Sequence, residues 1–259
     1  MAQFDAVAIT GASSGIGAAL ARACAGPGAV LHLVGRDAAR LEAVAEACRA
    51  RGAATHTALL DVRDAAAAEQ WIAAAGRLDL VVANAGISAG SSENGLAAPE
   101  RTRAILETNV MGVANTVLPA LRAMAAQAPG ADGWRGRIGV VASIAAFVPA
   151  PGAAAYCASK AAADTFAVAS ARRARAAGVL ISSICPGHVQ TPMTDRNRFP
   201  MPGLMDADRA AAIILRGLAA GQTRIAFPWW MAAAARLTGL LPPRLTGRLL
   251  AASQDATDL

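Results

Sequence analysis

The sequence predicts a single α/β domain of the doubly wound Rossmann type, with about seven parallel strands and helices on both faces of the sheet. Short apolar runs alternate along the chain with longer alanine-rich segments, and strands that alternate with helices form right-handed βαβ units. The apolar runs lack polar alternation, as expected when both faces of a sheet are covered. No repeat or low-complexity linker divides the 259 residues, which favours one domain.

Seven apolar runs are the predicted strands. In chain order they are "DAVAIT" (5–10), "AVLHLV" (29–34), "ATHTALL" (54–60), "LDLVVA" (78–83), "GRIGVVA" (136–142), "GVLISSIC" (178–185) and "TRIAFP" (223–228). The predicted helices lie between them, near residues 15–26, 37–51, 64–75, 98–127, 155–177 and 206–220. Residues 187–205 break this rhythm with three prolines, which is typical of a loop beside a site.

The composition excludes several classes of protein. Hydrophobic residues make up 55% of the chain and charged residues 16%, so a large core is expected. Aromatic residues at 4% argue against a stacking surface for nucleic acid. The net charge is +6, but the arginines are dispersed, and the densest group, in residues 171–178, is interpreted as a solvated helix end. We expect no nucleic-acid partner, whereas phosphate-bearing ligands remain open.

The cysteines and the N-terminus bear on the compartment. Cys24, Cys48, Cys157 and Cys185 are far apart and show no CxxC spacing, so neither a metal nor a disulfide is expected. The first residues run into an apolar strand without a basic region, and no run of 18 apolar residues occurs. These features predict a cytoplasmic protein with free thiols and without a signal peptide.

The turn after the first predicted strand has the composition of a nucleotide-binding loop. "TGASSGIG" (10–17) opens the first predicted helix, whose N-terminus presents unpaired N–H groups to a phosphate. Glycines there let the backbone turn tightly and approach a pyrophosphate. An ordinary glycine-rich turn is the alternative, but the preceding strand and following helix favour dinucleotide binding. The expected contacts are Gly11, Ser13, Ser14, Gly15, Ile16 and Gly17.

The end of the second predicted strand bears on the choice between NAD and NADP. A carboxylate there would accept hydrogen bonds from the ribose of NAD. Here Gly35 holds the position and Arg36 follows it, and arginine pairs well with a 2′-phosphate. We therefore favour NADP(H) and keep NAD(H) open, because Asp37 would either reach the ribose or cap the next helix.

Tyr156 and Lys160 are the only tyrosine and the only lysine, and all other basic residues are arginine. They lie four residues apart in "AAYCASKAA" (154–162) and so share one face of a predicted helix. A lone lysine indicates a position that needs a compact ammonium rather than a planar guanidinium. An alanine-rich helix with one amphipathic tyrosine and one surface lysine is the alternative interpretation.

With these motifs the sequence resembles the short-chain dehydrogenase/reductase family in its short form, from residue 5 to about residue 228. The resemblance implies a Rossmann fold and an NAD(P)-dependent oxidoreductase. One position departs from the pattern, since Ala83 stands where the family often has a first asparagine. The motifs, in the family's order, are "TGASSGIG" (10–17), "DV" (61–62), "ANAG" (83–86), "NVMG" (109–112), Ser143, "YCASK" (156–160) and "PGHVQT" (186–191).

The resemblance also implies roles at the matching positions. The added cofactor contacts are Asp61 and Val62 at the adenine, Asn84, Ala85 and Gly86 at the fourth strand, and Pro186, Gly187, Val189 and Thr191 at the nicotinamide carboxamide. The catalytic residues are Asn109, Ser143, Tyr156 and Lys160, of which Tyr156 and Lys160 also contact the cofactor.

Ketone reduction needs a hydride on carbon and a proton on oxygen. With a pKa of about 10, free tyrosine is a poor base near neutral pH. We expect the Lys160 ammonium to lower the pKa of Tyr156 and to donate to the cofactor ribose. Ser143 would hydrogen-bond the substrate oxygen, and Asn109 would hold a water that links Lys160 to solvent. Tyr156 would be the proton donor in reduction and the base in oxidation.

We predict an oxidoreductase that transfers a hydride between NADP(H) and a hydrophobic ketone or secondary alcohol. The pocket is expected to be mostly apolar, lined by Ser88, residues 144–147, Pro149, His188 and residues 193–205. Helices near residues 98–127 and 155–177 would form a subunit interface if the family pattern holds, which predicts a homodimer or homotetramer.

We assign residues 1–228 to the dinucleotide-binding and catalytic domain and residues 229–259 to an apolar C-terminal extension of it. Residues 229–252 combine tryptophans and leucines with scattered arginines. This tail would pack on protein or lie on a membrane surface. In the second case the enzyme would be a lipid ketone reductase that is peripheral at the membrane. A catalytically weak nucleotide-binding regulator is the other alternative.

Overall fold

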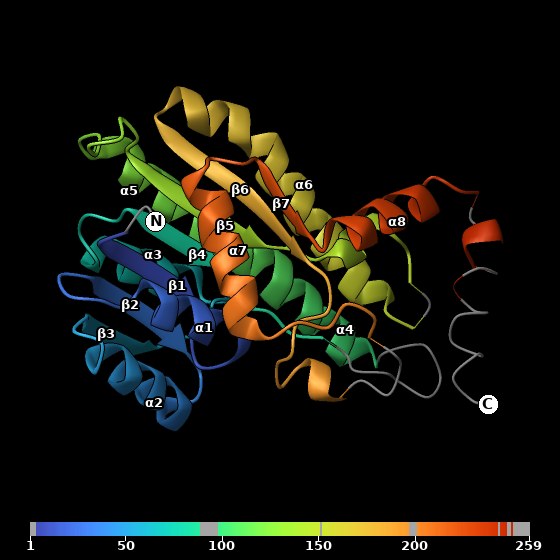
Figure 1. The fold of residues 1–259 in the computed structure, drawn as a ribbon, viewed down its shortest axis with the longest axis horizontal. Helices are drawn as coiled ribbons and strands as arrows, with labels where there is room; N and C mark the ends of the chain where they lie inside the picture. The colour runs from blue at the N-terminus through green and yellow to red at the C-terminus, as the bar shows by residue number, and fades with distance from the viewer. Residues whose placement is uncertain are drawn as a thin grey trace.

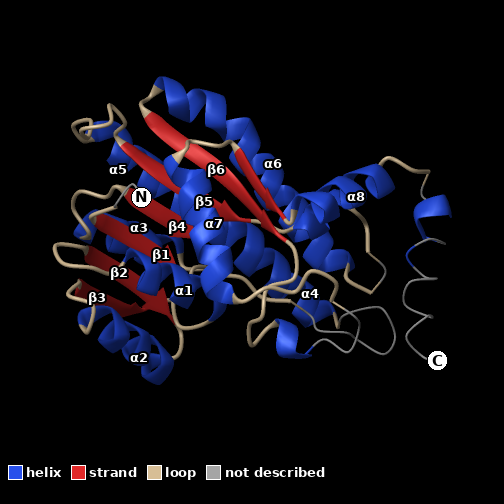
Figure 2. Cartoon of the chain, viewed as in Figure 1, coloured by secondary structure: helices blue, strands red, loops and turns tan. Residues whose placement is uncertain are grey.

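The computed structural model describes residues 4–88, 98–150, 152–196, 201–242, 244–247 and 250, and its centre is a sheet of seven strands (Figures 1 and 2). The strands are β1 (Ala6–Thr10), β2 (Val30–Gly35), β3 (Ala54–Leu59), β4 (Leu80–Ala83), β5 (Gly136–Val141), β6 (Val179–Pro186) and β7 (Arg224–Phe227). The α-helices are α1 (Gly15–Cys24), α2 (Ala38–Arg49), α3 (Ala65–Ala74), α4 (Pro99–Leu106), α5 (Gly112–Ala126), α6 (Ala154–Ala176), α7 (Ala207–Ala219) and α8 (Trp229–Gly239). The shorter turns are a π-helical turn, η1 (Glu107–Met111), and two 3₁₀ turns, η2 (Ile144–Phe147) and η3 (Thr194–Arg196).

The sheet is parallel throughout, in the order β3-β2-β1-β4-β5-β6-β7. The chain builds outward from β1 to β3 and then returns to the other side of β1, where Val7 is in register with Leu80 of β4. Ligands of doubly wound folds bind at the carboxyl ends of the strands where the order reverses. The strand order confirms the predicted fold class. The expected place for a site is the crevice at the carboxyl ends of β1 and β4, where the order reverses.

Two apolar layers form from alternate residues of each strand. Val7 and Ile9 of β1 join the layer that contains α1, α2 and α7, and Ala8 between them joins the layer that contains α3, α5 and α6. Figure 1 shows α1 and α7 on one side of the sheet. Because the residues of β1, β4, β5 and β6 are buried on both faces, these strands appear in the sequence as mainly apolar runs. The edge strand β3 is largely exposed.

The predicted strands are all present, with ends within two residues of the expected positions. The helix expected near residues 98–127 is present as one continuous helical stretch, in which the π-turn η1 lies between α4 and α5. Together these elements span Pro99–Ala126, the one helix among the described residues that is long and apolar enough to cross a membrane by length and composition. Half of that apolar window is buried inside the fold, where α5 packs against α3 and β5.

The tail prediction is met in part by α8, which packs on η2 and β7. The Arg236 guanidinium lies over the Phe147 ring at 4.5 Å, and a side chain at Gly239 would collide with the Phe147 carbonyl. Yet Trp229 is 78% exposed and Leu240 is 82% exposed. The helix therefore covers η2 with one face and presents apolar side chains on the other. Residues 243, 248–249 and 251–252 of the tail lie outside the described residues.

Candidate active site

A cavity of about 790 Å³ lies at the carboxyl edge of the sheet. It brings together segments as distant in sequence as β1 and the residues after β6. The predicted site residues that line it are Gly11, Ser13, Ser14, Gly15, Ile16, Arg36, Asp61, Val62, Asn84, Ala85, Gly86, Ser143, Tyr156, Lys160, Pro186, Gly187, Val189 and Thr191. Two further predicted residues, Gly17 and Asn109, are not among the residues that line the cavity.

The glycine loop is shaped by two positive φ angles and by two close approaches of the backbone. Gly11 and Gly15 have positive φ angles of 65° and 54°, a conformation that other residues adopt at a cost. A Cβ at Gly11 would also lie 2.8 Å from the Ala85 Cα. A Cβ at Gly17 would collide with the Gly11 carbonyl, so Gly17 lets α1 pack close beneath the loop instead of lining the cavity.

The loop is tied to the end of β4 by Thr10 and Asn84. The Thr10 Oγ1 accepts from the backbone N–H groups of Asn84 at 3.0 Å and Ala85 at 3.1 Å. In return the Asn84 Nδ2 donates to the carbonyls of Thr10 at 2.9 Å and Gly11 at 3.1 Å. Thr10 was not predicted as a site residue, because this role depends on a contact between strands 74 residues apart.

The start of α1 has the features of an anion site. Ser14 is the N-cap residue, and its side chain makes no capping hydrogen bond. The first N–H groups of a helix have no partner within it, and the helix dipole adds positive potential there. Without side chains at Gly11 and Gly15, the cavity reaches this backbone directly. The loop thus fits the diphosphate of a dinucleotide.

The far end of the cavity contains the charged groups Arg36, Asp37, Arg40 and Asp61. Asp37 caps α2, since its carboxylate accepts from the Arg40 N–H at 3.0 Å and from the Arg40 Nε at 2.8 Å. These hydrogen bonds hold the pKa of Asp37 below its usual value. Asp37 was expected either to reach the cofactor ribose or to cap the next helix, and in the structure it caps the helix. Arg36 makes a long ion pair with Asp61, at 4.0 Å.

The opposite end holds Ser143, Tyr156 and Lys160. Tyr156 and Lys160 both stand on α6, and the Lys160 Nζ lies 5.8 Å from the centroid of the tyrosine ring. The Lys160 Nζ donates to the Val141 carbonyl at 2.8 Å. Burial lowers the pKa of Lys160 from 10.5 to about 8. The three side chains predicted to act together are thus in one cavity.

The expected lowering of the pKa of Tyr156 is not found and has to be corrected. Burial raises the pKa of the phenol, and a hydrogen bond with Ser143 only partly opposes this effect. The physical reason is that the phenolate loses more free energy of hydration on burial than the hydrogen bond from Ser143 supplies. At neutral pH the tyrosine is therefore held as the neutral phenol.

Asn109 lies in η1, and its side-chain amide forms hydrogen bonds with other residues of the protein. The Oδ1 accepts from the Ile87 N–H at 2.8 Å, and the Nδ2 donates to the Ile87 carbonyl and the Ser159 Oγ, each at 2.9 Å. The amide therefore binds the segment after β4 to α6. Both Nδ2 donors and one of the two Oδ1 lone pairs are used in these contacts, and the water expected at Asn109 stays a prediction.

The substrate side differs from the prediction. Of the residues expected there, Met193 and Thr194 line the cavity, whereas Ser88, residues 144–147, Pro149 and His188 do not belong to its described lining. His188 Nδ1 lies 3.1 Å from the Pro202 carbonyl. Residues 89–97 and 197–200 lie outside the described residues. Lining residues that sequence reasoning missed are Val34, Arg40, Leu60, Ile87, Thr108, Val141, Ala142 and Pro192. Most of these end or follow a strand, and the carboxyl ends of the predicted strands are the signal that would have found them.

Comparisons with known proteins agree with this geometry. The family model described as short chain dehydrogenase matches residues 5–200. An uncharacterized oxidoreductase from Myxococcus xanthus is 38% identical over 90% of this chain and 91% of its own length. A protein from Streptomyces virginiae, described as a ketoacyl reductase of the monensin polyketide synthase, is 35% identical over 73% of this chain and 72% of its own length.

Solved structures also match over most of their length. A short-chain dehydrogenase/reductase from Burkholderia phymatum in complex with NAD has a TM-score of 0.81 at 26% identity, over 92% of this chain and 94% of that one. A short-chain dehydrogenase from Sphingobium yanoikuyae in complex with NADPH has a TM-score of 0.77 at 25% identity, over 90% and 94%. The chain belongs to the short-chain dehydrogenase family of NAD(P)-dependent oxidoreductases.

Proposed function

We propose that the protein reduces a hydrophobic ketone to a secondary alcohol with NADPH. The observation that carries this proposal is the meeting of Ser143, Tyr156 and Lys160 in the cavity that the glycine loop also lines. The loop at residues 11–17 would hold the pyrophosphate, and Asp61 and Val62 would lie against the adenine. Pro186, Gly187, Val189 and Thr191 would hold the nicotinamide end, where the bound cofactor supplies a hydride.

The proton for the carbonyl oxygen comes from Tyr156. As the carbonyl carbon takes up the hydride, negative charge develops on its oxygen, and Ser143 stabilises that charge by a hydrogen bond. Tyr156 transfers its phenolic proton to the oxygen, which completes the alcohol, and the resulting phenolate is reprotonated from solvent. Because burial raises the pKa of Tyr156, the acid form that the reduction uses is present at neutral pH.

The preference for NADPH is supported by Arg36. It lines the adenosine end of the cavity, and its side chain is 59% exposed. Its contact with Asp61 is long, at 4.0 Å, so its donors are available to a 2′-phosphate, which arginine binds in bidentate geometry. Arg36→Asp is expected to weaken NADPH binding far more than NADH binding in fluorescence titrations, and equal losses for both would contradict a role in reading the 2′-phosphate.

The ketone assignment rests on the lining at the nicotinamide end and on a relative. Ile87, Pro192 and Met193 give that end of the cavity apolar walls. The Streptomyces virginiae relative is described as a ketoacyl reductase, and a β-ketoacyl group is a ketone on an acyl chain. A carbonyl compound with an apolar chain or ring is therefore the proposed class.

The test is NADPH oxidation by the wild type and by Tyr156→Phe, with ketones graded from small and polar to long and apolar. We expect turnover of the apolar ketones by the wild type and a loss of about 10²-fold or more in the variant, which keeps the ring but lacks the proton. NADPH affinity serves as the control and should fall far less than the turnover, because the variant loses only the hydroxyl among the cofactor contacts. Binding of NADPH without reduction of any ketone would instead favour a nucleotide-binding regulator.

A second candidate is a lipid ketone reductase attached to a membrane surface through α8. It is favoured by the exposed Trp229 and Leu240 on a helix that is otherwise anchored to η2. We propose that residues 229–259 nevertheless belong to the same domain, since α8 packs on β7 and η2. Flotation with anionic vesicles tests the attachment. Binding that is lost in Trp229→Ser with Leu240→Ser supports it, and no binding by the wild type excludes it.

A further inference from the structure

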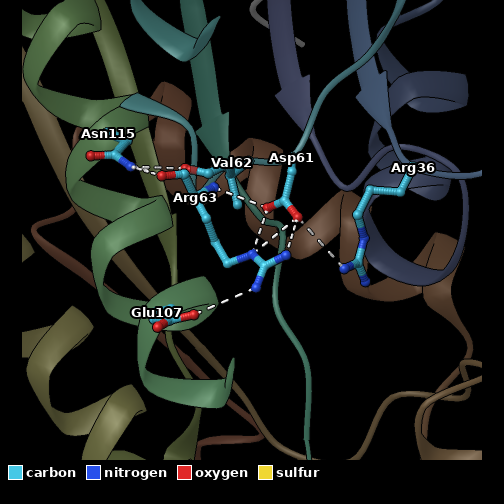
Figure 3. A network of polar contacts seen from close by, with 6 residues as sticks. All are labelled: Arg36, Asp61, Val62, Arg63, Glu107 and Asn115. Atoms are coloured by element: carbon cyan, nitrogen blue, oxygen red, sulfur yellow. Dashed lines mark hydrogen bonds and ion pairs between the residues drawn. The ribbon is translucent and has the colours of Figure 1, made fainter. Parts of the chain in front are cut away.

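Beside the adenosine end of the cavity, two arginines approach one carboxylate (Figure 3). Arg63 binds Asp61 closely, with its Nη2 at 2.7 Å and its Nε at 3.0 Å from Oδ2. The Nε also lies 3.1 Å from Oδ1, which accepts the Arg63 backbone N–H at 3.0 Å. Arg36 approaches the same Oδ2 only to 4.0 Å. Arg63 thus neutralises Asp61, and Arg36 stays largely uncommitted.

Arg63 is held in place from the side away from the cavity. Its Nη1 lies 3.4 Å from the Glu107 Oε2 on η1, and Figure 3 shows the guanidinium between the two carboxylates. The Asn115 Nδ2 on α5 donates to the carbonyls of Val62 at 2.9 Å and Arg63 at 3.2 Å. The backbone of the 61–63 segment and the side chain of Arg63 are therefore fixed by the helix behind them.

The charges of Asp61, Arg36 and Arg63 determine the electrostatic environment of a 2′-phosphate at this end of the cavity. Asp61 and Arg36 line the cavity, whereas Arg63 does not belong to its lining. Without Arg63, Asp61 would be an unpaired carboxylate 4.0 Å from the Arg36 Nη1, and it would draw Arg36 into its own ion pair. Both effects oppose binding of the phosphate. With Arg63 in place, the positive charge of Arg36 acts on the ligand.

We propose that Arg63 is a positioning and specificity-determining residue: by holding Asp61, it keeps Arg36 available to the 2′-phosphate and so sets the preference for NADPH over NADH. This inference rests on the proposed use of NADPH. The same hydrogen bonds hold the pKa of Asp61 below its usual value, so the carboxyl that Arg63 holds is ionised.

Fold stability gives a weaker reason for this arrangement. The side chains of Arg63 and Asp61 are 44% and 30% exposed, and exposed ion pairs contribute little to the free energy of unfolding. A purely structural role for Arg63 would appear as a lower unfolding temperature and as equal losses of affinity for both cofactors. A specificity role would appear as a change in the ratio of the two affinities.

The experiment measures the dissociation constants of NADPH and NADH by calorimetry for the wild type, Arg63→Met, Asp61→Asn and the double variant. Arg63→Met is expected to lower the NADPH preference, expressed as Kd(NADH)/Kd(NADPH), by roughly fivefold, the upper size of one exposed ion pair. NADH affinity and unfolding temperature should change little. Adding Asp61→Asn to Arg63→Met should restore the wild-type preference, because no bare carboxylate remains.

Arg49→Met is the matched control. Arg49 also pairs with a carboxylate, with its Nη2 2.7 Å from the Glu42 Oε1, but it lies outside the cavity lining. It makes the same change in net charge and should leave the preference within about twofold, since distant exposed charges are screened. An unchanged preference in Arg63→Met, or a double variant as poor as Arg63→Met, would overturn the role of Arg63. A wild type without NADPH preference would refute the proposed cofactor. The two results are distinguishable, because the role of Arg63 is tested by the difference in preference between the variants and the wild type.

Discussion

Lys160 is the only lysine of the chain, and it is placed where an ammonium is hard to keep charged. It is 4% exposed, and its bond to the Val141 carbonyl does not offset the loss of water. Burial lowers its pKa to about 8. We expect the bound cofactor to favour the charged form, because the ammonium would donate to the ribose hydroxyls and be attracted by the phosphates. Cofactor binding and protonation of Lys160 should therefore be linked.

We predict that NADPH affinity falls as the pH rises above about 8, by up to about tenfold per pH unit, because the complex then has to take up one proton. The sign follows from the direction of the shift. Below pH 8 the free protein already carries the ammonium, so affinity should be flat there. Calorimetric titrations at several pH values, in buffers of different ionisation enthalpy, measure both the affinity and the proton uptake.

Lys160→Met serves as the control for this linkage. It should bind NADPH more weakly at neutral pH and show no slope around pH 8. A wild-type dissociation constant that stays constant from about pH 7 to about pH 9.5, well across the lowered pKa, would show that protonation of Lys160 is not coupled to binding.

At the residue scale, the sequence predicted what depends on local pattern. The glycines of the first loop and the Tyr156–Lys160 pair are recognisable because their spacing is itself the requirement. Arg63 was missed, although its neighbours Asp61 and Val62 were predicted. Its importance comes from a carboxylate two residues away and from Glu107, 44 residues along the chain, and only the folded chain brings these groups together.

At the scale of elements, η1 joins the two ends of the cavity. Glu107 contacts Arg63 at the adenosine end, and two residues later Asn109 binds Ile87 and Ser159 at the catalytic end. A π-turn adds a residue to the helical repeat, and such turns are frequent at functional sites. This geometry directs Glu107 and Asn109 to different neighbours. It leaves no residue-type signal, which explains why the sequence predicted a helix near residues 98–127 without this turn in it.

Gly112, the first residue of α5, is predicted to be needed for the adenosine wall. A Cβ there would lie 2.5 Å from the Val62 Cγ2 and 3.1 Å from its Cβ. Gly112→Ala should gain up to about 1 kcal/mol in helix propensity but lose about 1–3 kcal/mol to overpacking. We expect a net loss of stability in denaturant unfolding and several-fold weaker NADPH binding, because Val62 lines the cavity.

The double variant Gly112→Ala with Val62→Ala tests the cause. Removing the Cγ atoms of Val62 makes space for the new methyl group, so the two substitutions should be less harmful together than the sum of their separate effects. Strictly additive losses would mean that the collision with Val62 is not the source of the instability.

For the whole molecule, the surface leaves an apolar face on the helices that cover one side of the sheet. Met111 on η1 and Leu118 on α5 are both exposed, Leu118 to 48%. We predict that this face forms the subunit contact of a homodimer or homotetramer. Leu118→Glu should then shift the mass in solution toward the monomer, because a charge in an apolar interface loses its hydration. Light scattering after size exclusion measures the mass.

The control is Leu59→Glu on β3, at the far edge of the sheet. Leu59 is also exposed, so the same charge is added away from α5. Its mass should equal that of the wild type. A monomeric wild type, or equal dissociation by both variants, would contradict an interface on α5.

The architecture as a whole was the most predictable level. Alternating apolar runs and helical segments determine a parallel doubly wound sheet almost by themselves, since both faces have to be covered. The path of residues 226–252 was less predictable. Its apolar composition is compatible with packing, a subunit contact or a lipid surface, and α8 both packs on η2 and exposes Trp229.

Because the chain has one lysine, chemical modification of Lys160 can measure whether the cavity is occupied. Lys160 is the only lysine side chain that amine-directed reagents can modify, and at 4% exposure it is reached only through the cavity that it lines. Its lowered pKa of about 8 gives it a larger share of free amine at mildly alkaline pH than an ordinary lysine has. A ligand that lies over Lys160 should protect it. One acylation footprint read by mass spectrometry would therefore report occupancy of this cavity directly in a crude extract, without an engineered label.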